Sequence, residues 1–479
     1  MATEASLHFK KLTDAGKPVG EVIAINSFLV SVKGLQPVSG HSVVMFEDGT
    51  HGFTRDILED RVTILRMGNS QLKIGSLVVV QDEDLTAKVG KDFIGRVVSV
   101  RGEPLDGKGA IAADADWPVF NRAPLIAERE LLDTQLETGV TLIDTLFPIV
   151  RGQRMALMGE SKSGRSTLAT QIALNQKKTD QVVVHVLIAK RRSDIDTLLA
   201  RLSETGAMEK SIVVVSTIFE SLVNSYLAPY VGCAMAEYLW QKAGQDVVII
   251  YNDLTTHAQL YREISLLLGS APGRDSYPGD IFHAHSSLLE RAGKLSANHK
   301  ALTAIPLVLV EGSDISAYLP TNIMAITDGQ WILSMDMFRR GHRPAIDTGL
   351  SVTRVGGVGQ NPRQKKQGSA VLKLLAEYAR VSEYARFGAE LSPASQQLIK
   401  RGQQFEAMFT QAPTEIHPLL AQQLMVEVLL SPDSPSEINI ESLKQNADSL
   451  GGQIASENDY QTNLAKLKAA ISRPPEAAK

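Results

Sequence analysis

The chain has 479 residues, 44% of them hydrophobic and 21% charged, which is typical of a soluble globular protein with several domains. The formal net charge of -4 argues against nucleic acid or an anionic membrane surface as the main partner. A membrane span, a secretory signal and an internal disulfide are not expected, because no apolar run reaches roughly 18 residues, the N-terminus lacks an apolar core, and Cys233 is the single cysteine.

The first predicted domain, residues 1–85, is a small β-barrel. Within residues 20–83, short β-rich runs alternate with turn signals such as Lys33-Gly34 and Asp48-Gly49. Short, evenly spaced strands separated by such turns are typical of a barrel.

Residues 86–367 are predicted to form an α/β P-loop domain with a mostly parallel sheet, because short apolar strands alternate with helices there. A long helix is expected over roughly 218–243, where Cys233 lies in an apolar run and should be buried and unreactive. The expected strands are RMALM, QVVVHVLIA, KSIVVVST, DVVIIYND, IPLVLVE, IMAITDG and WILSMDM.

Residues 368–479 are predicted to form an all-α C-terminal domain. The strand pattern stops near residue 367, and four following segments carry helical periodicity instead. These segments begin at Ser369, Pro393, His417 and Asn458.

The stretch MGESKSGRST, residues 158–167, has the spacing of a phosphate-binding loop between a strand and a helix. Glycines let backbone N–H groups curl around a phosphate, the helix N-terminus favours negative charge, and Ser166 can reach a magnesium ion. The alternative is an ordinary strand-to-helix turn. The candidate binding residues are Gly159, Glu160, Ser161, Lys162, Ser163, Gly164, Arg165 and Ser166.

Four long motifs resemble the alpha subunits of F-type ATP synthases: TGVTLIDTLFPIVRGQRMALMGES, PGRDSYPGDIFHAHSSLLERAGKL, DISAYLPTNIMAITDGQ and RPAIDTGLSVTRVG. The resemblance covers nearly the whole chain, and GLSVTRVGG and LIAKRRSD are similar to the alpha rather than the beta pattern. It implies a barrel, a RecA-like nucleotide domain and a helical domain. It also implies a subunit that binds ATP or ADP without turning it over.

The resemblance further implies a set of partners. Alpha subunits alternate with catalytic beta subunits in a hexameric ring around the gamma shaft, and contact the delta subunit or peripheral stalk. Such a ring belongs to a proton- or sodium-translocating ATP synthase. We therefore expect the chain at the cytoplasmic face of a bacterial plasma membrane, bound only through the complex, with an organelle inner or thylakoid membrane as the alternative.

Three residues depart from the family pattern where nucleotide chemistry is concentrated. Arg165 replaces the loop lysine, and a planar guanidinium does not fill the space of an ammonium. Asn252 replaces the strand-end aspartate that supports magnesium, and Lys190 stands at or close to the place of the beta subunit's catalytic carboxylate.

From these departures we expect no ATPase activity of the isolated chain and weakened Mg²⁺ support. The site is then expected to hold a nucleotide, to hold an anion, or to be empty. Asp253 is the neighbouring carboxylate, but it can replace position 252 only where the strand end is irregular, because successive strand residues point to opposite sides.

Arg354 in GLSVTRVGG matches the arginine finger that alpha subunits lend to the neighbouring catalytic site, with a structural salt bridge as the alternative. Ser351 is expected to position it. Arg343 resembles a residue near the bound nucleotide, or else forms an interface salt bridge, and Gln411 sits where the family holds the adenine edge. Pro413 departs from the glutamine expected there.

His283 and His285 have i,i+2 spacing, for which packing is favoured over metal ligation. Two other functions remain open: a catalytic ring ATPase of the secretion or Rho-helicase type, and a degenerate stand-alone paralogue. A catalytic ATPase requires a loop lysine and a carboxylate base, whereas a paralogue outside a ring has no use for Arg354.

Overall fold

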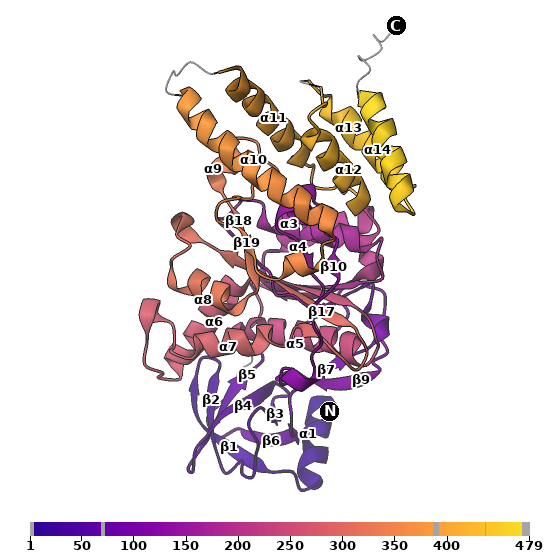
Figure 1. Ribbon diagram of the computed structural model, residues 1–479. Coiled ribbons are helices and arrows are strands. Elements are labelled where there is room, and N and C mark those ends of the chain that lie inside the picture. Colours follow the sequence, from indigo (N-terminus) through magenta and orange to yellow (C-terminus); the bar gives the residue numbers. More distant parts are fainter. Residues whose placement is uncertain (1–3, 69–71, 387–391, 436, 472–479) are drawn as a thin grey trace.

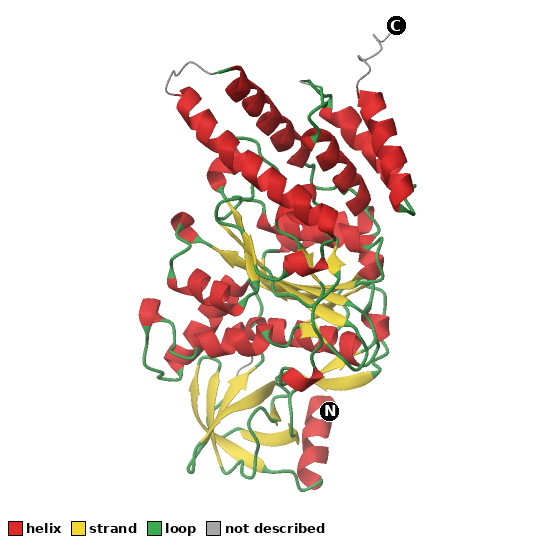
Figure 2. Ribbon diagram, in the orientation of Figure 1, coloured by secondary structure: helices red, strands yellow, loops and turns green. Residues whose placement is uncertain are grey.

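The computed structural model describes residues 4–68, 72–386, 392–435 and 437–471. Three parts follow one another along the molecule (Figure 1): a barrel at the N-terminal end, a central sheet flanked by helices, and a group of helices at the C-terminal end. Figure 2 shows that the C-terminal part consists of helices and loops. This arrangement confirms the predicted fold class.

Six antiparallel strands close the N-terminal barrel in the order β1-β2-β5-β4-β3-β6. Alternate side chains point inward, so that Val22, Ile64 and Val78 meet in a separate apolar core. Helix α1 (Glu4–Asp14) packs on the outside of the barrel through Phe9. The strands are β1 (Val19–Asn26), β2 (Leu29–Lys33), β3 (Val43–Phe46), β4 (His51–Ile57), β5 (Val62–Arg66) and β6 (Leu77–Asp82).

The central sheet has nine strands, in the order β19-β18-β12-β17-β15-β13-β14-β8, with β16 paired beside β17. Pairing is parallel from β18 to β8, and antiparallel for β19 and β16. The strands are β8 (Arg96–Ser99), β12 (Ala156–Gly159), β13 (Val182–Lys190), β14 (Ser211–Thr217), β15 (Val247–Asn252), β16 (Gly293–Lys294), β17 (Ala301–Leu309), β18 (Gly329–Leu333) and β19 (Val352–Thr353).

Different helices cover the two faces of this sheet, because successive strand residues point to opposite sides. On one face, Val184 and Val186 pack in the same core as α5 (Leu222–Gln241). On the other face, Val183 shares a core with α3 (Arg165–Gln176) and with the C-terminal helices. Cys233 of α5 is buried as predicted, and burial raises the pKa of its thiol to about 11.

The C-terminal helices continue the second core rather than forming one of their own. Phe405, Leu424 and Leu443 belong to the same apolar cluster as Leu168 of α3 and Trp331 of β18. The helices are α10 (Pro362–Arg386), α11 (Pro393–Phe409), α12 (Leu419–Leu430), α13 (Ile440–Gly451) and α14 (Glu457–Ile471). The predicted domain boundary after residue 367 falls inside α10, and the domain limits stay predictions.

The remaining elements surround the sheet and link it to the barrel. Helix α8 corrects the sequence analysis, which predicted a strand at IMAITDG: Ile323 and Ile326 are buried one helical turn apart, and β18 begins only at Gly329. Two small two-stranded sheets pair β7 with β9 and β10 with β11. The elements are α2 (Thr141–Leu146), α4 (Arg192–Glu204), α6 (Leu254–Leu267), α7 (Ile281–Leu289), α8 (Tyr318–Ile326), α9 (Met335–Arg339), β7 (Thr86–Val89), β9 (Ala115–Pro118), β10 (Gln135–Leu136) and β11 (Ile149–Val150).

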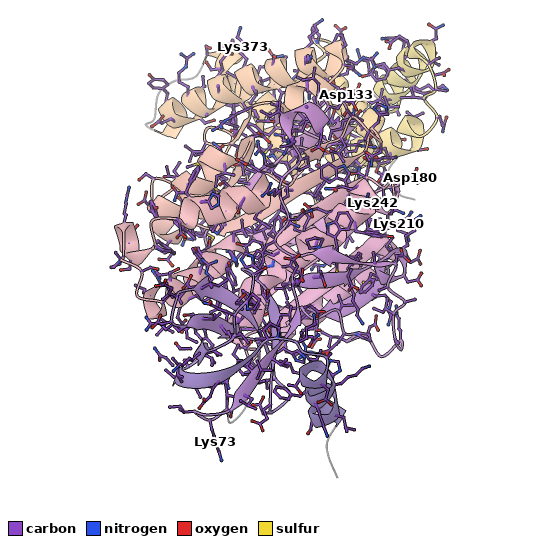
Figure 3. All side chains as sticks on the ribbon, turned by 90° about the horizontal axis from the view of Figure 1, so that it is seen from below. Lys73, Asp133, Asp180, Lys210, Lys242 and Lys373 are labelled. Atoms are coloured by element: carbon purple, nitrogen blue, oxygen red, sulfur yellow. The ribbon has the colours of Figure 1, made fainter. Side chains whose placement is uncertain are left out.

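Acidic and basic side chains are both present at the outer surface. Figure 3 shows Lys73, Asp180 and Lys242 at the periphery of the molecule, and all three are exposed. Within the described residues, none of the helices combines the length and apolar character needed to cross a bilayer.

Candidate functional site

The predicted phosphate loop lies between β12 and α3, as the motif requires. Gly164 caps α3 with φ 103°, a left-handed conformation that favours glycine. A Cβ at Gly159 would lie 2.7 Å from Ser163 Oγ and 2.9 Å from Leu333 Cβ, so the start of the loop also requires glycine. The first turn of α3 therefore presents its backbone N–H groups at the end of the loop, where an anion is favoured.

The loop's polar side chains have different surroundings. Ser163 is buried, and its hydroxyl donates to Glu160 O at 2.8 Å. The carboxylate of Glu160 accepts a hydrogen bond from the Ser313 hydroxyl. Ser161 and Lys162 are exposed at the tip of the loop. Internal hydrogen bonds thus stabilise the loop, and Lys162 places a positive charge at its exposed tip.

Arg165, which replaces the loop lysine, is half-buried at the start of α3. Burial lowers the pKa of this guanidinium, while the charge of Asp253 acts in the opposite direction. In the part of the chain that the structure describes, the Arg165 side chain has no hydrogen bond or ion pair. Its donors are therefore available to an anion at the loop.

Two adjacent parallel strands, β13 and β15, end beside the loop at Lys190 and Asn252. Lys190 Nζ lies 2.8 Å from Asp253 Oδ2, and the side chains of this pair are only 19% and 10% exposed. Asp253 Oδ1 also accepts from Thr256 N at 2.8 Å, which caps α6. Burial alone would raise the pKa of Asp253, but Lys190, the Thr256 N–H and Arg165 together lower it.

Asn252 contacts the loop directly, because its Nδ2 donates to Ser166 Oγ at 3.4 Å. Asn252 and Asp253 therefore both reach the same polar cluster, although successive residues within a strand face opposite sides. Asp253 follows the end of β15, so strand alternation does not govern its direction. Sequence reasoning missed the pairing of this carboxylate with Lys190.

The side chains near Ser166 do not fit a magnesium ion. Mg²⁺ is usually held by one or two carboxylates together with water and phosphate oxygens. The Asp253 carboxylate already contacts an ammonium group, and Asn252 directs a donor at Ser166 Oγ. Asp194, an exposed residue of α4, is a second carboxylate near Ser166, because both residues line the same small cavity. Across the described ranges, no group of three or more His, Cys, Asp or Glu side chains could hold a metal.

Two cavities meet at Thr167, near the start of α3. The smaller, about 200 Å³, contains Ser166, Lys190 and Asn252 in its wall. The larger, about 700 Å³, lies between the loop and the C-terminal helices. Its wall includes loop residues, apolar residues at and after the end of β18, and residues of the C-terminal part, namely Ser163, Gly164, Leu333, Phe338, Pro344, Ala345, Ala407, Ala412 and Pro413.

Gln411 and Arg343 also line the larger cavity, but each contacts the protein's own backbone. Gln411 Nε2 donates to Gly139 O and Glu415 O, both at 3.0 Å, and its Oε1 accepts from Thr141 N at 2.7 Å. Arg343 Nη1 donates to two backbone carbonyls at 2.7 Å and the guanidinium stacks 3.4 Å from the Phe338 ring centre. Nucleotide contacts by Gln411 and Arg343 stay predictions.

Sequence reasoning missed a charged network in the wall of this cavity. Glu415 Oε1 accepts from Lys444 Nζ at 2.7 Å and lies 2.9 Å from His417 Nε2, and His417 Nδ1 lies 2.9 Å from Asp448. Burial alone would raise the pKa of Glu415. The hydrogen bonds from His417 and Lys444 have the larger effect and lower this pKa to about 2. Lys444 and Glu415 are 29 residues apart, so no local spacing signals this contact.

Arg354 lies at the opposite end of β18 from the chain's own loop. Gly159 of the loop pairs with Leu333, the last residue of β18, whereas Thr353 pairs with Gly329, the first. At roughly 3.3 Å per residue, this separation is about 13 Å along the strand. The Arg354 side chain is exposed, and its hydrogen bonds are to Thr327 and Met324 rather than to the phosphate loop of its own chain.

Hydrogen bonds hold both the Arg354 side chain and the backbone beside it. Arg354 Nη1 and Nη2 donate to Thr327 O and Met324 O at 3.2 and 3.3 Å, near the C-terminal end of α8. Ser351 is 4% exposed, and its Oγ accepts from Ile332 N at 3.0 Å. Thr353 Oγ1 donates to Pro148 O at 2.8 Å. Ser351 therefore ties the segment to β18, and its role in positioning Arg354 stays a prediction.

The two predicted histidines differ in exposure. His283 is exposed, whereas His285 is buried with its Nε2 3.3 Å from His257 Nδ1. Burial lowers the pKa of His285 to about 4. His285 thus packs in the interior as an uncharged ring.

Comparison with known proteins supports the resemblance to ATP synthase alpha subunits over most of the chain. Residues 139–353 match the nucleotide-binding domain of the ATP synthase alpha/beta family, and residues 360–473 match the C-terminal domain of the ATP synthase alpha/beta chain. The ATP synthase subunit alpha of Anaplasma marginale (strain Florida) is 38% identical over 426 residues, covering 87% of this chain and 83% of that protein.

Two further relatives carry the same name. The ATP synthase subunit alpha of Nitrosomonas europaea is 37% identical over 415 residues, covering 84% of this chain and 81% of that protein. That of Thiobacillus denitrificans is 36% identical over 419 residues, covering 85% and 81%. With its barrel, nucleotide-binding domain and helical domain in this order, the chain belongs to the ATP synthase alpha subunit family.

Proposed function

We propose that the chain is a non-catalytic alpha subunit of an F1 ring, which alternates with beta subunits and lends Arg354 to the neighbouring catalytic site. The ring surrounds the rotating gamma shaft, contacts the delta subunit or peripheral stalk, and couples ATP synthesis or hydrolysis to proton or sodium transport. The chain reaches the membrane, at the cytoplasmic face of a bacterial plasma membrane, only through this complex.

The position of Arg354 carries this proposal. Its guanidinium is exposed, is oriented by two carbonyls, and lies at the far end of β18 from the chain's own loop. An arginine placed there is useful to a phosphoryl group bound by a neighbouring subunit. A planar guanidinium can neutralise the charge that spreads over the transferring phosphoryl oxygens.

The chain's own loop supports the non-catalytic half of the proposal. A base that polarises attacking water needs a free carboxylate. Lys190 stands at or close to the place of that base, and its ammonium pairs with Asp253. Any ATP or ADP at this loop is bound without turnover, and its magnesium complex is bound more weakly than at a loop with a lysine and a strand-end aspartate.

Steady-state ATPase assays on rings reconstituted with a beta subunit test the role of Arg354. Arg354→Ala is expected to lower hydrolysis roughly 10³-fold, because an arginine finger contributes on this scale. Arg61→Ala, which removes an exposed arginine of the barrel, is the matched control and should leave the rate unchanged. Near-normal hydrolysis by intact Arg354→Ala rings would show that this arginine has a structural role only.

A further inference from the structure

The Lys190–Asp253 ion pair occupies the polar centre beside Ser166. Its N–O distance is 2.8 Å, and both side chains are largely shielded from water. A charged hydrogen bond in such surroundings is stronger than an exposed one. A divalent cation at Ser166 would have to approach this ammonium or displace it from the carboxylate.

The charges of the cluster favour an anion. Arg165 and Lys190 are cationic, Asp253 contacts Lys190 and acts on Arg165 only through its charge, and Asn252 is neutral. Asp194 and Arg201 also line the smaller cavity, with one charge of each sign. The start of α3 adds the positive end of a helix of 12 residues. Phosphate oxygens are therefore favoured at this point without a metal ion.

The larger cavity adds room for the rest of a nucleotide. Its volume of about 700 Å³ lies within the range of roughly 300–1,000 Å³ that is usual for small-molecule sites. Thr167 borders both cavities, so a ligand can extend from the cluster across the start of α3. Phe338, Pro344 and Pro413 form apolar walls against which a flat base can pack.

We propose that this site takes a nucleoside di- or triphosphate free of divalent cation, with the Lys190 ammonium supplying the positive charge that a metal ion supplies elsewhere. The unpaired guanidinium of Arg165, the N-terminus of α3 and Lys190 together bind the phosphate chain. The inference concerns the chain's own loop and is independent of the role of Arg354.

Equilibrium titration of the purified full chain with ADP, in excess EDTA and in excess Mg²⁺, tests the inference without any substitution. ADP is expected to bind at least as tightly in EDTA as in Mg²⁺, whereas a magnesium-dependent site loses affinity when the metal is removed. Tighter binding in Mg²⁺, or no binding in either condition, would overturn the proposal.

Two variants then locate the effect. Lys190→Gln should weaken metal-free ADP binding by roughly tenfold or more, because it removes a charged contact, and should free Asp253 so that Mg²⁺ now improves binding. Lys178→Gln makes the same charge change just beyond α3 and should alter neither. Equal effects of the two substitutions would show a nonspecific charge response and contradict the assignment to Lys190.

Pyrophosphate in EDTA tests whether the base is recognised. It is expected to compete with ADP but to bind more weakly, since it leaves the larger cavity empty. Pyrophosphate affinity equal to that of ADP would contradict the nucleoside part of the proposal. Loss of activity in Arg354→Ala rings bears only on the ring function, so failure of one proposal is distinguishable from failure of the other.

Discussion

The phosphate loop and the Arg354 segment lie at opposite ends of β18, and they present different groups to a ligand. At the loop, Arg165, Asn252 and Lys190 all depart from the residues that metal-dependent nucleotide chemistry requires. At the other end, GLSVTRVGG resembles the alpha pattern, Ser351 Oγ accepts from Ile332 N, and Thr353 Oγ1 donates to Pro148 O. Under the proposed function, the chain has lost the support for chemistry at its own loop and keeps the arginine that acts on a neighbouring subunit.

Replacing Arg354 with lysine sharpens this comparison and should have the largest effect. Arg354→Lys keeps the charge but loses the planar pair of donors, so hydrolysis by reconstituted rings should still fall roughly 10²- to 10³-fold. The measurement is steady-state ATPase, with ring yield as the control. A lysine variant that restores most of the activity would mean that charge alone is needed at this position.

Gly356→Ala should disturb the Arg354 segment, which hydrogen bonds hold in place. An added Cβ would overlap the carbonyl of Pro148 and lie 2.5 Å from Thr353 Oγ1, so the segment beside Arg354 must shift. We expect a loss of about 3 kcal/mol in the free energy of unfolding, measured in denaturant.

Gly357→Ala is the matched control for that substitution. A Cβ at Gly357 meets nothing within 4 Å, so this change should cost little. Similar stability losses in the two variants would show that close approach at Gly356 is not what constrains the segment.

Arg165→Lys combined with Asn252→Asp should make the loop more like a metal-dependent one. The double variant restores a compact ammonium and a strand-end carboxylate, so affinity for the magnesium complex of ADP should rise by about tenfold. Calorimetric titration of the original chain and the variant measures the change. Equal affinities would mean that these two positions do not limit magnesium-nucleotide binding.

A pH dependence at His417 is the smallest expected effect. Burial disfavours the charged ring, but Asp448 and Glu415 outweigh it and raise the pKa of His417. The stabilisation is therefore complete below the unfolded pKa of about 6.5 and is lost as the pH rises through the higher folded value. The free energy of unfolding of the wild-type chain should fall over this window, and that of His417→Gln should fall less. Parallel pH profiles would contradict the assignment.

The fold and the loop were predictable because their signals are local. The strand-loop-helix at Gly159–Ser166 and the apolar runs of β13, β14 and β15 appear in consecutive residues. The strand predicted at Ile323 was wrong, because β-branched residues in a short apolar segment fit a strand or a buried helix equally well. Helix α13, which carries Lys444, was not anticipated.

Contacts between distant residues could not be predicted in this way. Lys190 and Asp253 are 63 residues apart and meet only because β13 and β15 are neighbours in the sheet. The family motif predicts that Gln411 holds the adenine edge, but it does not predict the hydrogen bonds that the Gln411 amide donates to Gly139 O and Glu415 O. Such pairings depend on strand order and loop path, which a linear pattern does not contain.

The apolar core shared by the sheet and the C-terminal helices has a mechanical consequence. Phe405 and Leu424 belong to the same cluster as Leu168 of α3, the helix that starts at the phosphate loop. Close-packed side chains are nearly incompressible and transmit small displacements instead of absorbing them. A displacement of the C-terminal helices α11 and α12 should therefore move α3 and the phosphate loop with them as a single rigid body.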